Sequence, residues 1–593
     1  MAVLLLCAER FQWFLNYPTL VLLRRLGYIE PFMNEMSFQL GPIADVVDAA
    51  LRDAQQQQVV KRIWRKDASL WKTDPKAHDN IRSSLGWLTV TDEMIGVADE
   101  LMEYAEFIRQ RGFQYVMVCG MGGSSLCPEV LRRSFGQQPH FPELIVLDST
   151  DPDFIGSLAY RINSDKTLFI VASKSGSTIE PTTFYKFWYE YLAQLNSTPG
   201  QNFIAITDPG SPLVEDASRL NFQRVFLNQA DIGGRFSALS YFGMVPAALA
   251  GIDIRKLLGR AKNAEQSCSP AIPLDSNPGL QLGAVLGEAF AAGRDKLTLV
   301  IDSRISSLGL WIEQLVAEST GKEGKGILPV AGETLGEPSV YGSDRLFVAI
   351  SIGEMDLGVN QKLDALSAAG HPVVRRKLDD VYDLGSEFLI WEFATACAGW
   401  RLGINPFDQP DVQLAKQATN DVLQVFKEQR QLPPHNEAAK DDLLSLFMDD
   451  EASSSNSVEK VLASHIAKTK PGDYIAVLAF VEETTETQKL LQQLQKHLRD
   501  KTGCATTTGY GPRYLHSTGQ LHKGGPNTGV FIEITSNDET DWPIPGEDYS
   551  FSVLKKAQAF GDFRALARKG RRVLGVDLGD NGVKALKRLA ELL

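Results

Sequence analysis

The chain has 593 residues, 44% of them hydrophobic and 22% charged, and a formal net charge of −13 at pH 7. This length exceeds what one hydrophobic core serves, so we expect roughly three or four structural units, and the acidic balance argues against nucleic-acid binding, which needs basic surface. Six scattered cysteines and eight histidines lack the spacings of a disulfide framework or a metal site, which favours a reducing cytoplasm.

The N-terminus begins with a short apolar run that Glu9 and Arg10 interrupt. The run is too short to span a membrane and lacks the basic start of a signal peptide, so we expect no membrane attachment. We treat residues 1–40 as an N-terminal extension. Its first 35 or so residues could be read from an upstream start codon, with Met33 or Met36 as the natural start.

Short apolar runs alternate with helical patterns over most of the remaining chain. Residues 41–112 are predicted to be mainly helical and to pack as a cap on the first α/β block after them. Strands are then expected at 115–119, 144–147, 168–171 and 203–206, and a second alternating block at 297–301, 327–330 and 346–350. Such alternation predicts parallel, doubly wound sheets, whose ligands lie beyond the carboxyl ends of the strands.

The sequence therefore predicts an α/β fold with two doubly wound, parallel-sheet domains and a site between them. Their expected ranges are 41–270, including the helical cap, and 271–427. A mobile linker is expected at 428–460, where prolines, acids and a serine run occur, and a smaller α/β region at 461–593.

The loop 173–178 follows an apolar strand and precedes a helix. Backbone N–H groups at such a helix start attract phosphate. The hydroxyls of Ser173, Ser175 and Thr178 add donors, and Lys174 adds positive charge. The alternative is a turn that is rich in serine because serine caps helices well, and the loop alone does not separate the two.

Other candidate groups are ambiguous when taken singly. The run Gly120-Met-Gly-Gly-Ser-Ser125 lacks the third glycine of a dinucleotide fingerprint, which favours a smaller ligand. Arg235 follows two glycines, a pattern more often found in a plain turn. Gln314 and Glu318 share a helix face, with Glu318 at the helix C-terminus, where a carboxylate is unfavourable unless it faces solvent or serves a function. Lys416 would ordinarily be a solvated lysine.

Five stretches together resemble the glucose-6-phosphate isomerase family, in its order and spacing. They are Gly-Met-Gly-Gly-Ser-Ser, Ser-Lys-Ser-Gly-Ser-Thr, Gly-Gly-Arg-Phe-Ser, Glu-Ser-Thr-Gly-Lys and Asn-Pro-Phe-Asp-Gln-Pro…Lys, and the resemblance covers roughly residues 40–420. The chain is most similar to the isomerase half of bacterial transaldolase–isomerase fusions, which share the stretch 509–525. Fewer than about 115 residues precede the first expected strand, too few for a transaldolase barrel.

The resemblance implies interconversion of glucose 6-phosphate and fructose 6-phosphate through a cis-enediol, in glycolysis and gluconeogenesis. It implies that the two doubly wound domains are of the sugar-isomerase type, and it implies a homodimer and no metal or organic cofactor. By the same resemblance, Ser173, Lys174, Ser175 and Thr178 bind the phosphate, Gly123 and Ser124 line the sugar, Arg235 stabilises the enediolate, Gln314 orients the substrate, Glu318 transfers the proton between C1 and C2, and Lys416 helps to open the ring.

The ring-opening histidine does not follow the family pattern. In the family it lies between the glutamate and lysine motifs and usually reaches in from the partner subunit. Here that interval holds only His371, without the family's sequence context. His522, in Gln-Leu-His, is closer to the family's Gly-Gln-His but follows Lys416. We rank His522 first, His516 second and His371 third, and each could equally be a structural histidine.

Two other functions compete with this interpretation. A sugar-phosphate-binding regulator on the same fold would need the phosphate loop but neither Glu318 nor Lys416, so the presence of both favours an enzyme. A related isomerase for mannose 6-phosphate or an amino sugar phosphate would use the same proton transfer. Pocket shape, which the sequence does not reveal, would distinguish these substrates.

Overall fold

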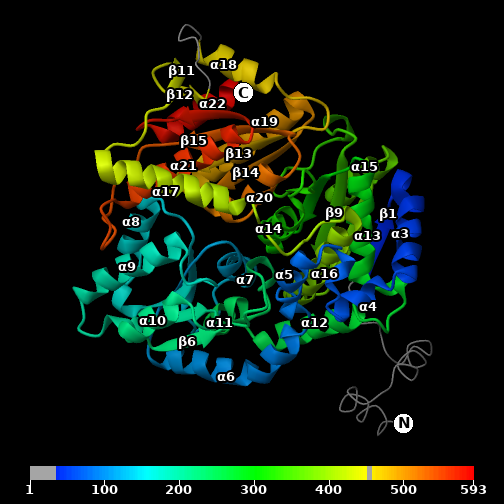
Figure 1. The fold of residues 1–593 in the computed structure, drawn as a ribbon, viewed down its shortest axis with the longest axis horizontal. Coiled ribbons are helices and arrows are strands. Elements are labelled where there is room, and N and C mark those ends of the chain that lie inside the picture. Colours follow the sequence, from blue (N-terminus) through cyan, green and yellow to red (C-terminus); the bar gives the residue numbers. More distant parts are fainter. Residues whose placement is uncertain (1–34, 450–456) are drawn as a thin grey trace.

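The computed structural model describes residues 35–449 and 457–593, which form three β-sheets with covering helices (Figure 1). We call each sheet with its helices the first, second and third unit. Figure 1 shows the third unit, yellow to red, above the first unit in cyan and beside the second in green. The proposed mis-started segment falls almost wholly on residues 1–34, which lie outside the described residues. None of the helices in the described ranges has the length and hydrophobicity of a membrane span.

The first sheet is parallel throughout, in the order β3-β2-β4-β5-β6. Its strands are β2 (Tyr115–Gly120), β3 (Glu143–Leu147), β4 (Thr167–Ala172), β5 (Phe203–Thr207) and β6 (Arg224–Leu227). The first four confirm the predicted runs, which are continuously apolar because both faces of a parallel sheet are buried. The half-exposed β6 carries too weak a hydrophobic run to have been predicted.

The second sheet has the order β1-β10-β9-β7-β8. Its parallel strands are β7 (Lys296–Ile301), β8 (Leu328–Val330), β9 (Arg345–Ile352) and β10 (Val373–Leu378). The edge strand β1 (Glu35–Gln39) pairs antiparallel with β10. The assignment of residues 35–39 to an extension was therefore wrong, because their backbone completes this sheet.

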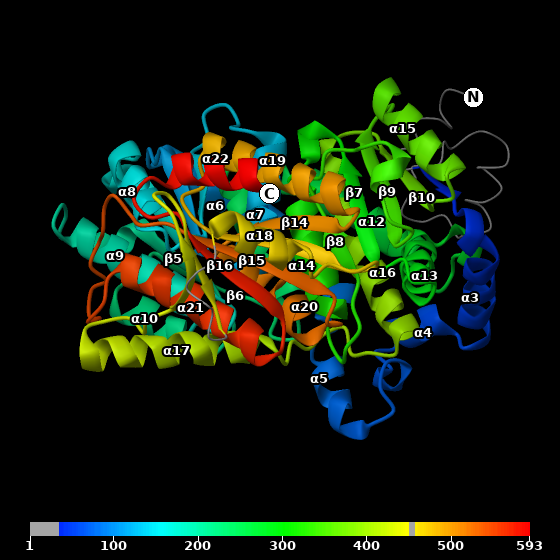
Figure 2. The same cartoon turned by 90° about the horizontal axis from the view of Figure 1, so that it is seen from above.

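The predicted helical cap is divided between two units. Helix α3 (Ala44–Gln56) packs against α13 (Pro278–Ala291) of the second unit, as Figure 2 shows at its right-hand edge. Helix α6 (Val90–Gln110) instead packs against α11 (Tyr241–Leu249) and α12 (Ile254–Ser267). One continuous core joins these helices to both sheets, so a single cap over the first sheet was an incorrect expectation for residues 44–56.

The third sheet has the order β11-β12-β16-β15-β13-β14. Strands β13 (Tyr474–Phe480), β14 (Ala505–Tyr510), β15 (Gly529–Thr535) and β16 (Arg572–Asp577) are parallel. The hairpin β11 (Asn436–Lys440) and β12 (Ser445–Met448) continues the sheet at β16. Part of the predicted linker is thus ordered, because Leu446 and Ala438 are buried in this unit's core. Residues 450–456 lie outside the described part.

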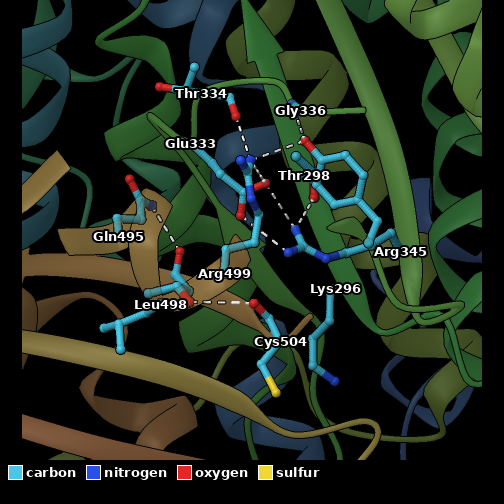
Figure 3. Close-up of polar contacts among 12 residues, drawn as sticks. Lys296, Thr298, Glu333, Thr334, Gly336, Arg345, Gln495, Leu498, Arg499 and Cys504 are labelled. Atoms are coloured by element: carbon cyan, nitrogen blue, oxygen red, sulfur yellow. Dashed lines mark hydrogen bonds and ion pairs between the residues drawn. The ribbon is translucent and has the colours of Figure 1, made fainter. Parts of the chain in front are cut away.

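The third unit packs against both other units. Helices α17 (Val412–Gln429) and α21 (Phe551–Arg568) pack together and share a hydrophobic core with one face of the first sheet. Against the second unit, Glu333 lies between the guanidinium groups of Arg345 on β9 and Arg499 on α19 (Thr485–Thr502) (Figure 3). All three side chains are buried. The third unit is therefore held in a fixed position beside the ends of the other two.

Candidate active site

Two glycine-containing loops meet at the carboxyl end of β2. A Cβ atom built on Gly123 would lie 1.9 Å from the carbonyl oxygen of Gly234. Only glycine therefore permits this approach between the turns η5 (Gly122–Ser124) and η8 (Gly234–Phe236), which places Arg235 beside Gly123 and the buried Ser124. The proximity of these groups was implied by the resemblance and not by the spacing of the residues.

The predicted phosphate loop lies between β4 and α9 (Ile179–Ala193). The Ser173 hydroxyl donates to Thr178 Oγ1 at 3.2 Å, and the Ser177 backbone N–H donates to Ser175 Oγ at 3.3 Å. Gly176 has a φ of +66°, which favours glycine. The loop thus gathers hydroxyl groups in front of a helix start, which suits an anion.

Lys174 departs from the expected arrangement. Its ammonium forms an ion pair with Asp208 and donates to the carbonyl of Ala230 at 2.9 Å. Burial raises the pKa of the Asp208 carboxyl, and Lys174 offsets only part of that rise. The structure therefore places the Lys174 charge at the border of the loop, where Asp208 compensates it, instead of leaving it free above the hydroxyls.

Glu318 lies near the C-terminus of α14 (Leu308–Thr320), and Arg235 compensates its unfavourable position there. Arg235 Nη1 is 3.3 Å from Glu318 Oε1, with side chains 2% and 11% exposed. Arg235 also donates to Ser319 Oγ at 2.7 Å and to the carbonyl of Pro406 at 2.7 Å. Burial lowers the pKa of Arg235, and the charges of Glu318 and Asp408 oppose that effect. The pair places a carboxylate beside a fixed cation in a largely dry site.

Gln314 links this carboxylate to the third unit. Its Nε2 donates to Glu318 Oε2 at 3.0 Å and to the backbone carbonyl of His516 at 2.8 Å. Its Oε1 is buried and has no hydrogen-bond partner among the described residues. A buried acceptor without a partner is costly, so a substrate hydroxyl that donates to it would bind favourably.

His516 is the histidine that the structure brings to this site. It ends the short turn η13 (Arg513–His516), and its Nε2 lies 2.9 Å from Glu180 Oε1. Gln558 donates to the same oxygen at 2.8 Å. Burial alone would raise the pKa of Glu180. The charge of His516, its hydrogen bond to Glu180 and the charge of Lys416 outweigh burial and lower that pKa.

The other two histidines lie elsewhere. His522 is buried among the rings of Tyr474, Tyr514 and Phe531, and neither ring nitrogen has a partner in the described ranges. Burial holds the pKa of His522 well below its ordinary range, so the ring is neutral. His371 packs against Phe347, and burial also lowers its pKa. His522 lies on α20 (Gly519–Gly524), which packs into the third unit's core, so the geometry favours His516 over His522 as the candidate histidine.

Two polar residues at this site were not among the predicted ones. Gln409 accepts from Arg235 Nη1 at 3.0 Å, and Glu180 holds His516. Gln409 stands inside the recognised Asn-Pro-Phe-Asp-Gln-Pro stretch, and Glu180 lies two residues after Thr178. Their nearness to those motifs was the only available signal. Lys416, on α17, is exposed and forms no hydrogen bond or ion pair with the described residues.

Comparisons with known proteins find similarity to sugar-phosphate isomerases. A family model described as phosphoglucose isomerase matches residues 91–339. A probable glucose-6-phosphate isomerase of Methanococcus maripaludis is 27% identical over 384 residues, which are 58% of this chain and 85% of the relative. The glucose-6-phosphate isomerase of Mycoplasmopsis pulmonis is 27% identical over 382 residues, 56% of this chain and 88% of the relative.

Two solved structures share the architecture. A hypothetical protein from Thermus thermophilus has a TM-score of 0.56 and 25% identity, covering 65% of this chain and 99% of its own. A glucose-6-phosphate isomerase from Chlamydia trachomatis has a TM-score of 0.55 and 19% identity, covering 66% and 89%, and supports the fold alone. Paired parallel sheets with a hydroxyl-rich loop define an α/β protein of the sugar-isomerase type. Within that class, residues 91–339 are similar to the phosphoglucose isomerase family, and the two relatives described above are named as a probable and an assigned glucose-6-phosphate isomerase.

Proposed function

We propose that this chain is a glucose-6-phosphate isomerase in which Glu318 is the base that moves a proton between C1 and C2. The observation that carries the assignment is the buried Glu318–Arg235 pair at 3.3 Å, with Gln314 bound to the same carboxylate at 3.0 Å. A regulator that only binds sugar phosphate would need the hydroxyl loop but not this pair. The substrate is a small sugar phosphate held through its phosphate by the loop 173–178.

The reaction has two stages, ring opening and proton transfer, and different residues act in each. His516, oriented by Glu180, and the nearby Lys416 exchange protons with the ring oxygen and the C1 hydroxyl. Glu318 then removes the proton from C2 of the open aldose and returns it to C1, while protons shift between the two oxygens, so no external oxidant or reductant takes part. Arg235 offsets the negative charge that develops on the enediolate.

Binding of the phosphate loop supplies energy away from the reacting carbons. That energy is available to orient C1 and C2 against Glu318 and to exclude water from the enediol. The two groups are fixed on different elements, with the loop before α9 and the base on α14. Proper function therefore depends on the packing of the first unit against the second.

We further propose that one chain completes this site. The family resemblance implies a homodimer with the histidine from the partner, whereas His516 and Glu318 here belong to the same chain. Mixing the inactive variants Glu318→Gln and His516→Asn, with subunits exchanged by mild denaturant and refolding, tests this. Sites within one chain would give no recovered activity, whereas sites shared between two copies would recover about a quarter of it.

The activity itself is tested by a coupled assay that starts from fructose 6-phosphate and records glucose 6-phosphate through a dehydrogenase. For Glu318→Gln we expect kcat to fall about 10²–10⁴-fold with KM little changed, because proton transfer is lost while the binding groups remain. The matched control is Glu323→Gln, whose carboxylate is exposed and pairs with Lys72. Retention of most activity by Glu318→Gln would remove it as the base, and faster turnover of mannose 6-phosphate would change the assigned substrate.

A further inference from the structure

A separate cavity lies beside the candidate active site, where the three units meet. Its volume is about 220 Å³. Arg133 of the first unit, Glu313 of the second, and Tyr510, Arg513 and His522 of the third are among its lining residues. The catalytic groups assigned above are absent from this lining, so the cavity is not the isomerase site under another description.

The positive charges around the cavity are already compensated. Glu483 lies 3.2 Å from Arg133 and 2.8 Å from Arg513, and so bridges the two guanidinium groups. Arg513 also makes a bidentate contact to Asp148, with both distances 2.8 Å. Arg133 contacts Glu129 in addition. No spare positive charge is left for an anionic ligand such as a sugar phosphate.

In contrast to the two arginines, Glu313 has no opposite charge beside it in the described part of the chain. The residue is 9% exposed, and its side chain lines the cavity and has no hydrogen bond or ion pair with the residues that the structure describes. Burial without a cationic partner raises the pKa of Glu313 to about 8. A buried carboxyl group without a partner is costly, and a ligand cation placed beside it would remove that cost. The side chains of Thr508, Thr518 and Gln488 line the same cavity and are unpaired within the described ranges.

We propose that this cavity binds a small hydroxylated primary amine, whose ammonium group pairs with Glu313 and whose hydroxyls reach the threonine and glutamine side chains, and that its occupancy modulates the isomerase. The modulation rests on the proposed function, but the binding does not. Two elements connect the sites. Helix α14 presents Glu313 to the cavity and Gln314 to the active site, and η13 carries Arg513 in the cavity wall and His516 in the active site.

Only Glu313 among the titratable lining groups changes charge between pH 6 and 8. His522 is neutral, since burial keeps its pKa well below the ordinary value. Burial opposes ionisation of Glu483, but the two arginines outweigh it and lower its pKa. Burial raises the pKa of Tyr510 to about 12 and that of Tyr514 well above its ordinary value, and the guanidinium groups stay charged. Binding of an amine cation should therefore be linked to loss of the Glu313 proton.

The test is calorimetric titration of the full chain with 2-amino-1,3-propanediol, using glycerol as the uncharged molecule of the same shape. We expect the amine to bind and glycerol to give no heat. Affinity should rise close to tenfold from pH 6 to pH 7, with about one proton released per bound amine. Glu313→Gln should abolish binding and leave kcat of the isomerase unchanged in the absence of amine.

Each opposite result overturns a defined part of the proposal. Equal binding of glycerol, binding retained by Glu313→Gln, or an affinity independent of pH would each refute the amine site. The pH series uses the unaltered chain, so it decides the question even if the variant fails to fold. Binding that leaves kcat and KM unchanged would refute the modulation alone. Absence of isomerase activity would refute the proposed function while the calorimetric result on the amine still stands.

Discussion

Replacing Glu333 by glutamine tests how the third unit is held against the second. Glu333 Oε2 lies 3.2 Å from Arg345 Nη2, and Glu333 Oε1 lies 3.4 Å from Arg499 Nη1. The three side chains are at most 1% exposed, so water cannot replace the lost carboxylate. Arg345 would lose the carboxylate that pairs with it, and Arg499 would keep only its pair with the partly exposed Asp500. Because breaking a buried ion pair from one side costs about 3–5 kcal/mol, we expect a loss of that size in the free energy of unfolding.

The loss would be measured by urea denaturation followed by tryptophan fluorescence, with hydrogen exchange of β8 and β14 reporting on the contact between the units. The control is Glu459→Gln, which breaks the exposed pair with Arg588 and should cost under about 1 kcal/mol. Isomerase activity should fall with Glu333→Gln, because the third unit carries His516. A cost for Glu333→Gln no larger than that of the control would show that the Asp500 carboxylate, the Tyr341 hydroxyl and the Thr334 carbonyl, which also contact Arg499, suffice to stabilise it.

Three further substitutions probe the site itself. Gly123→Ala should lower kcat about 10²-fold in the coupled assay, because the added Cβ would lie 1.9 Å from the Gly234 carbonyl oxygen and displace the reacting groups. The control Gly96→Ala adds a Cβ with no atom within 4 Å and should leave kcat unchanged. Lys416→Ala should change the free energy of unfolding by no more than about 0.5 kcal/mol, because the side chain is exposed. The same variant should open the sugar ring more slowly, which would be measured as a lower rate with the closed form of the sugar. Burial opposes ionisation of the Glu180 carboxyl, but His516 and Lys416 outweigh burial and lower its pKa from 4.5. The contribution of ionised Glu180 to stability is therefore present above pH 4.5 and is lost as pH falls through the folded-state pKa. Urea midpoints for Glu180→Gln should therefore differ most from those of the unaltered chain at neutral pH and converge with them in acid, and a constant difference would contradict this linkage.

The alternation of strands and helices was predictable because buried parallel strands such as β4 are continuously apolar over their whole length. Edge elements were not predicted. β1 carries alternating polar residues and gains its pairing from β10, more than 300 positions along the chain, and the short β12 depends on β16 in the same way. A local pattern carries no information about such distant pairing, so the edges of the second and third sheets required the tertiary structure.

The sequence by itself determined the loop chemistry of this protein. The hydroxyl-rich loop 173–178 and the spacing of Gln314 and Glu318 are local properties, and the family resemblance followed from them. Tertiary structure alone decided that Arg235 compensates Glu318, and that His516 and not His522 lies beside Glu180. The physical reason is distance along the chain, because His516 and Glu180 are 336 positions apart, and only the packing of three separate sheets brings their side chains within hydrogen-bonding range.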